Sequence, residues 1–129
     1  MSYGTSVTLD LPFDDAVGRV RAALAGQGFG VLTEIDVTST LRVRLGEQME
    51  DYIILGACNP PAAHQALGID RSIGLLLPCN VVVRATADGT LVEALDPQVM
   101  VTLTGQPELK PVAADVGRRL ARALAALTS

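Results

Sequence analysis

Aromatic residues are scarce in this chain of 129 residues, which has no tryptophan, two phenylalanines and two tyrosines. Proteins that bind bases by stacking rely on aromatic side chains, so the sequence gives little support to such a surface. Apolar residues make up 49% of the chain, and the core is therefore expected to be aliphatic. The length fits a single domain, residues 1–129, which buries roughly two thirds of its unfolded surface.

Positive charge and long apolar runs are also in short supply. The net charge is −4, and Arg118, Arg119 and Arg122 are the only basic cluster, so no nucleic-acid partner is expected. The longest apolar run, around Leu75–Leu77, is far too short to cross a membrane. Residues 1–5 lack the features of a signal peptide. We expect a cytoplasmic protein with no membrane contact, in which the two cysteines are free thiols.

Hydrophobic periodicity predicts an α+β fold with one twisted sheet and helices packed mainly on one face. A hairpin turn at Ala87–Thr90 argues against a purely parallel sheet. Asp14 and Asp36 are expected to cap the first two helices. The connection Ile69–Leu77 is apolar and fits neither periodicity. The expected strands are residues 7–11, 29–35, 52–58, 79–86 and 90–95, and the expected helices are 14–26, 37–46, 61–67, 97–103 and 111–127.

Two cysteines lie where an apolar run meets proline and asparagine, in the segments 54–60 and 75–81. Cys58 ends one predicted strand and Cys79 begins the next. If these strands are antiparallel neighbours, both thiols lie at the same rim of the sheet. If the strands are parallel, the thiols lie at opposite ends. The spacing between the two cysteines matches no known zinc or redox motif.

Three polar residues near the cysteines complete the candidate ligand-binding set, which is Cys58, Asn59, His64, Cys79 and Asn80. His64 lies in the helix after Cys58, where it could join a Cys-Cys-His site for a soft metal or act as a base beside Cys58. An exposed position is the more common one for a lone histidine in the first turns of a helix. A role as a helix cap is sufficient to explain an asparagine at position 59. Asn80 has no such explanation, because asparagine is uncommon in strands.

Three sequence blocks resemble the domain-of-unknown-function family 302. They are residues 28–37, the block Ile-Leu-Gly-Ala-Cys-Asn-Pro at 54–60, and the block Gly-Leu-Leu-Leu-Pro-Cys-Asn-Val at 74–81. The resemblance covers nearly the whole chain. It implies a TBP-like α+β layer with a largely antiparallel sheet, and a homodimer. The family has no established activity, so the resemblance supplies no catalytic residue, and any cofactor or metal stays unknown. Pro61 departs from the family's usual residue after Asn-Pro, which stiffens the loop beside Cys58.

Three functions are open at this point. The leading hypothesis is a binding or sensing module, without turnover, for a small molecule or a thiophilic metal at the Cys58/Cys79 rim. The second is a thiol-dependent enzyme or redox protein with Cys58 as nucleophile, activated by the dipole and free N–H groups of the following helix. The third is a structural or interaction protein with no site.

Association is the last expectation from the sequence. Contiguous apolar surface commonly marks subunit contacts, and two-fold symmetric pairing is the commonest solution. We expect a homodimer in which Ile69–Leu77, or a neighbouring sheet edge, is covered by the partner.

Overall fold

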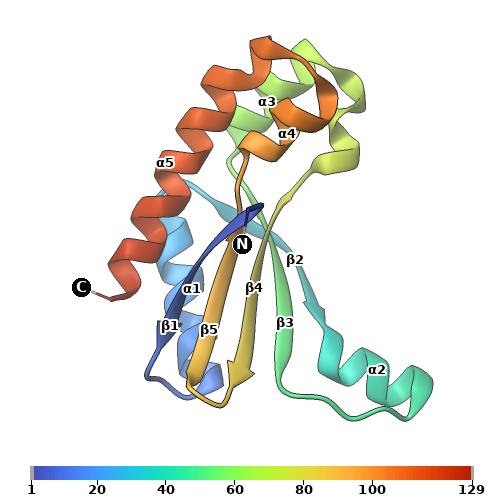
Figure 1. The fold of residues 1–129 in the computed structure, drawn as a ribbon, viewed down its shortest axis with the longest axis vertical. Helices are drawn as coiled ribbons and strands as arrows, with labels where there is room; N and C mark the ends of the chain where they lie inside the picture. Colours follow the sequence, from blue (N-terminus) through green and yellow to red (C-terminus); the bar gives the residue numbers. More distant parts are fainter. Residues whose placement is uncertain (1, 129) are drawn as a thin grey trace.

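The computed structural model describes residues 2–128, in which five strands form one sheet with helices mainly on one face (Figure 1). The sheet order is β1-β5-β4-β3-β2, and each neighbouring pair is antiparallel. The predicted α+β class is confirmed, as is the largely antiparallel sheet. The strands are β1 (Gly4–Leu9), β2 (Gly30–Asp36), β3 (Tyr52–Cys58), β4 (Cys79–Thr86) and β5 (Gly89–Leu95).

The helices divide into three groups (Figure 1). Two long helices, α1 (Phe13–Gly26) and α5 (Lys110–Leu127), lie against each other behind the sheet. At one end of the sheet are α3 (Pro60–Ile69), α4 (Gln98–Thr104) and two 3-10 helices, η1 (Arg71–Leu76) and η2 (Pro107–Leu109). At the other end, α2 (Val37–Leu45) projects from the connection between β2 and β3.

The core lies between the sheet and the two long helices. Alternate residues of the central strands point toward the helices, and Leu55, Val83 and Val92 are 0% exposed. Val116 and Leu120, one helical turn apart on α5, are buried against them. Complete burial of each such side chain contributes roughly 1.5–3 kcal/mol.

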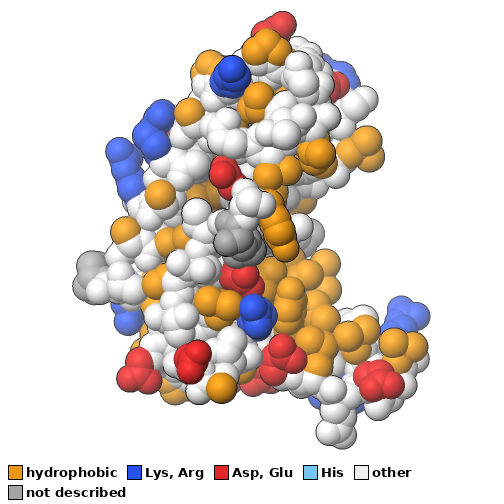
Figure 2. Space-filling view, in the orientation of Figure 1, with side chains coloured by type: hydrophobic (Ala, Val, Ile, Leu, Met, Phe, Trp, Pro, Cys, Tyr) orange, Lys and Arg blue, Asp and Glu red, His pale blue; other side chains and the backbone are white. Residues whose placement is uncertain are grey.

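The other face of the sheet carries no helix, and α2 stands beside it (Figure 1). Figure 2 shows apolar side chains gathered over β3 and β4 and continuing onto α2. Within α2 no residue is buried, and Val43 and Leu45 are 78% and 68% exposed. The molecule therefore presents an apolar sheet face with a projecting apolar helix next to it.

The apolar connection Ile69–Leu77 belongs largely to the chain's own core. Its middle forms η1, and Ile73 is 1% exposed, while Leu76 and Leu77 pack against the core. Leu75 is its one large apolar side chain that projects, at 89% exposure. The sequence predicted a partner-covered surface here because the segment is apolar. The fold buries most of those apolar side chains within the same chain, so they need no partner.

Two predicted helix starts are wrong by a residue or two. The residue that caps α1 is Pro12 rather than Asp14, and no side chain caps this helix. α3 begins at Pro60, one residue earlier than predicted, and continues to Ile69. The cap of α2 is confirmed, because the Asp36 carboxylate accepts a hydrogen bond from the Ser39 N–H at 2.9 Å. Across residues 2–128, no helix has the length and hydrophobicity needed to span a membrane.

Candidate functional site

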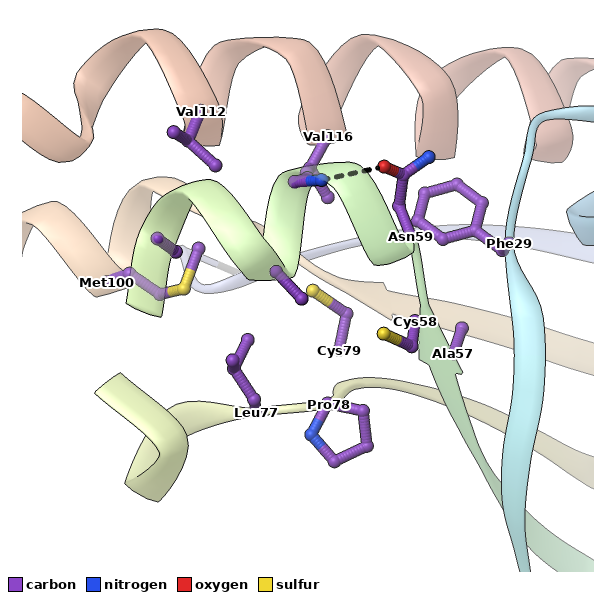
Figure 3. A pocket seen from close by; sticks show the side chains of 13 residues that line it. Phe29, Ala57, Cys58, Asn59, Leu77, Pro78, Cys79, Met100, Val112 and Val116 are labelled. Carbon is purple, nitrogen blue, oxygen red and sulfur yellow. Dashed lines mark hydrogen bonds between the residues drawn. The ribbon is translucent and has the colours of Figure 1, made fainter. Parts of the chain in front are cut away.

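The antiparallel pairing of β3 with β4 brings the two cysteines to the same end of the sheet. Ala57 is the register partner of Cys79, so Cys58 is one residue beyond that pair. Both cysteines are free thiols; Cys58 is half-buried and Cys79 is 6% exposed. In Figure 3 both sulfurs are directed into the space between α3 and the Leu77–Pro78 segment. Of the two arrangements left open by the sequence, the shared rim is the one present.

A small pocket, which we call the thiol pocket, surrounds these two sulfurs (Figure 3). Its volume is about 20 Å³, enough for one or two water-sized molecules. Asn59 is its one polar lining residue without sulfur. The other walls are apolar and come from elements that are far apart in the sequence, namely Phe29, Ala57, Ala62, Ala63, Ala66, Leu77, Pro78, Met100, Val112 and Val116.

Burial controls the chemistry of Cys79. Loss of hydration, and secondarily the nearby Cys58 thiol, raise the pKa of the Cys79 thiol to about 11. Burial disfavours the charged thiolate, and a second thiolate next to it repels that charge. Cys79 therefore remains a neutral thiol at neutral pH and is a poor nucleophile in the folded protein.

Alkylation kinetics test this assignment. In the parent protein, burial and Cys58 together raise the pKa of the Cys79 thiol to about 11. In the Cys58→Ala variant, the alkylation rate of Cys79 should rise through a midpoint below that value but well above that of a free cysteine, because the larger cause, burial, remains. A free cysteine titrates near about 8.5, so at pH 8 the Cys79 thiolate of the parent protein should be at least about a hundredfold scarcer. Because only the unfolded thiol ionises between those values, folding stability should fall as pH rises across this range. A Cys79 midpoint near that of free cysteine contradicts the assignment.

Asn59 connects the thiol pocket to the loop between α1 and β2. Its Oδ1 accepts a hydrogen bond from the Ala62 N–H at 3.1 Å, and its Nδ2 donates to the Gly28 carbonyl at 3.2 Å. Arg119 donates to the neighbouring Gln27 carbonyl at 3.2 Å. The predicted cap by Asn59 is confirmed. Arg119, one of the three clustered arginines, therefore helps to hold this loop.

Replacing Asn59 with alanine should lower the free energy of unfolding by about 1–3 kcal/mol. The change removes a helix cap, which typically contributes about 0.5–2 kcal/mol, and leaves the Gly28 carbonyl without this donor. Urea unfolding measures the difference. Asn80→Ala is the matched control because Asn80 is exposed, and its effect should stay within about 0.5 kcal/mol. Equal effects for the two variants would show that the Asn59 hydrogen bonds contribute no stability.

The start of α3 offers Cys58 few N–H groups. Pro60 and Pro61 occupy its first two positions and have no N–H. The Ala62 N–H is bonded to Asn59 Oδ1, and the Ala63 N–H to the Asn59 carbonyl at 2.9 Å. The expectation that free helix N–H groups stabilise a Cys58 thiolate is therefore wrong, because these groups are absent or already bonded. The nucleophile hypothesis loses its main physical support.

The remaining two candidate residues lie elsewhere. His64 is exposed on α3 and does not line the thiol pocket. Asn80 follows Cys79 in β4, so it points to the opposite, open face of the sheet. There it lines a separate hollow of about 230 Å³ together with Tyr3, Tyr52 and Glu93. Of the five candidates, the thiol pocket brings together Cys58, Asn59 and Cys79.

Sequence reasoning missed the residues that close the pocket. Met100 from α4 and Val116 from α5 are both buried against it. Both lie in predicted helices, but nothing local connects them with the cysteines. Pro78 was noted only as a strand boundary, yet it forms one wall beside both thiols (Figure 3). Within residues 2–128, no group of three or more His, Cys, Asp or Glu side chains could hold a metal ion.

Comparison with known proteins gives two findings. The family model described as domain of unknown function DUF302 matches residues 5–127. The chain is also similar to a solved structure, the uncharacterized conserved protein DUF302 from Bacillus stearothermophilus. The two share 30% sequence identity with a TM-score of 0.89, over 96% of this chain and 97% of that one. No curated protein matches the chain.

Proposed function

The chain belongs to the DUF302 family, and we propose that it is a binding module whose site is the thiol pocket. Cys58 and Cys79 act together there to hold one small thiophilic species. The observation that carries the proposal is that two thiols from adjacent strands line one apolar pocket.

The size of the pocket supports one of the two ligand classes that the sequence left open. A cavity of about 20 Å³ admits one or two water-sized groups. An organic ligand would have to displace the walls formed by α3 and Leu77–Pro78. A single metal ion fits without such movement, and thiolates are ligands for soft metals. The metal version of the proposal is therefore favoured.

Protection of the thiols from alkylation tests the proposal. We expect at least one soft ion, among zinc(II), cadmium(II), copper(I) and silver(I), to protect Cys58 and Cys79 together at one ion per chain. In Cys58→Ala and Cys79→Ala the remaining thiol should lose most of its protection, because one sulfur holds the ion far less well than two. If no ion slows the alkylation of either thiol, the pocket is not a metal site.

A second proposal concerns association, and it rests on a different surface. Two copies of the chain pair through the open sheet face and α2. The favouring observation is that α2 has no buried residue. A helix of nine residues is marginal without packing, since most helical stability in proteins comes from a covered apolar face. A partner copy would provide that cover.

A further inference from the structure

Sulfur atoms are the side-chain atoms of the thiol pocket that are available to bind a metal ion. Three of its lining residues carry sulfur, namely Cys58, Cys79 and Met100. The one polar side chain without sulfur is Asn59, and both of its polar atoms are already bonded within the fold. Thiolate and thioether are the soft ligands of proteins, whereas harder ions prefer oxygen and imidazole.

A zinc ion would be under-coordinated in this pocket. Zinc takes four ligands in nearly all structural sites and three protein ligands in catalytic sites. No third His, Cys, Asp or Glu joins the two cysteines among residues 2–128, and His64 is exposed outside the pocket.

Building on the function proposed above, we propose that the pocket is an all-sulfur site for a soft monovalent cation, copper(I) or silver(I), held between the Cys58 and Cys79 thiolates. Filled-shell monovalent ions of this kind are satisfied by two or three soft ligands, so the pocket needs no further donor. Met100 also lines the pocket, at the end away from the two cysteine sulfurs (Figure 3), so its thioether adds no hard ligand that would favour zinc over copper(I).

Binding exchanges protons for the cation. One S–H bond breaks at each cysteine, one sulfur–metal bond forms at each, and two protons pass to the solvent. The cation keeps its charge and no electron is transferred. Affinity should therefore fall as the pH is lowered, because metal binding competes with protonation of both sulfurs.

Competition binding with the reduced, full-length chain tests this inference. The probes are silver(I), and copper(I) supplied with a chromophoric chelator, against zinc(II) and cadmium(II). We expect one monovalent ion per chain, bound at least on the order of a hundredfold more tightly than either divalent ion. X-ray absorption of the copper(I) form should show sulfur neighbours only.

Variants locate the site and its ligands. Cys58→Ala and Cys79→Ala should each weaken silver(I) binding by at least on the order of a hundredfold, while the exposed His64→Gln should bind as the parent does. If Cys79→Ala fails to fold, the half-buried Cys58→Ala variant carries the comparison. Equal affinity for zinc(II), nitrogen or oxygen neighbours in the absorption spectrum, or weakening in His64→Gln would overturn the inference while leaving a thiol site in place. A chain that binds none of the four ions contradicts the proposed function itself.

Discussion

Replacing Gly56 with alanine is expected to lower the free energy of unfolding by about 3 kcal/mol or more, the upper range for overpacking. Gly56 lies in β3 between register partners Thr33 of β2 and Asn80 of β4. A Cβ at this position would overlap Thr33 Oγ1 and would lie 2.8 Å from Pro78 Cγ. Hydrogen-bonded strands flank Gly56 on both sides, so the backbone has little freedom to relieve the overlap.

Urea unfolding measures the loss of stability. Two further variants test whether steric overlap of the added Cβ is its cause. Gly18→Ala is the matched control, because Gly18 is exposed in α1 with nothing within 4 Å of the added Cβ. It should raise stability by about 0.5–1 kcal/mol. Adding Thr33→Ala to Gly56→Ala should recover part of the loss and leave the Pro78 overlap. A loss below about 1 kcal/mol in Gly56→Ala would show that the flanking strands can move enough to relieve the overlap.

The elements of this fold follow from local patterns, and the site depends on pairing that those patterns do not specify. Alternating residues and the Asp88–Gly89 turn are sufficient to predict the β4–β5 hairpin. The pairing of β3 with β4 spans α3 and η1, and no short-range signal determines it. The sequence therefore left the Cys58 and Cys79 arrangement open until the antiparallel neighbours were observed.

Asn80 and His64, the two predicted site residues that lie outside the thiol pocket, were misplaced for different reasons. Successive residues within a strand point to opposite faces, so in β4 Asn80 faces away from the pocket that Cys79 lines. That error was avoidable from the sequence. The position of His64 depends on how α3 rotates against the sheet, which tertiary packing determines. Arg119 is a similar case, because its partner Gln27 lies 92 residues away in the sequence.

The homodimer remains a prediction, and the structure provides a sharper way to test it. Light scattering at micromolar concentration should give twice the chain mass of 13.5 kDa. Val82 lies near the middle of the open sheet face, with Ile54 and Glu93 as its register partners. Val82→Lys should convert the protein to a monomer, because a charge buried at an interface without a partner costs several kcal/mol. Glu93 already pairs with Arg84 at 2.9 Å, so the lysine has no free carboxylate partner at the interface, whereas in the free monomer it has access to water.

Leu75→Lys is the control that separates this surface from the one indicated by the sequence. Leu75 is the exposed large apolar residue of the Ile69–Leu77 segment, at 89% exposure, and its replacement should leave the dimer mass unchanged. Thermal unfolding of each variant establishes that loss of association is not loss of folding. If Leu75→Lys separates the copies and Val82→Lys does not, the partner covers the end of the molecule near η1. A parent protein that stays at 13.5 kDa at every concentration means that α2 persists without a second copy. In that case its stability comes from its own capping, through the Asp36 carboxylate and the Thr38 hydroxyl, which donates to the Glu50 carbonyl at 2.7 Å.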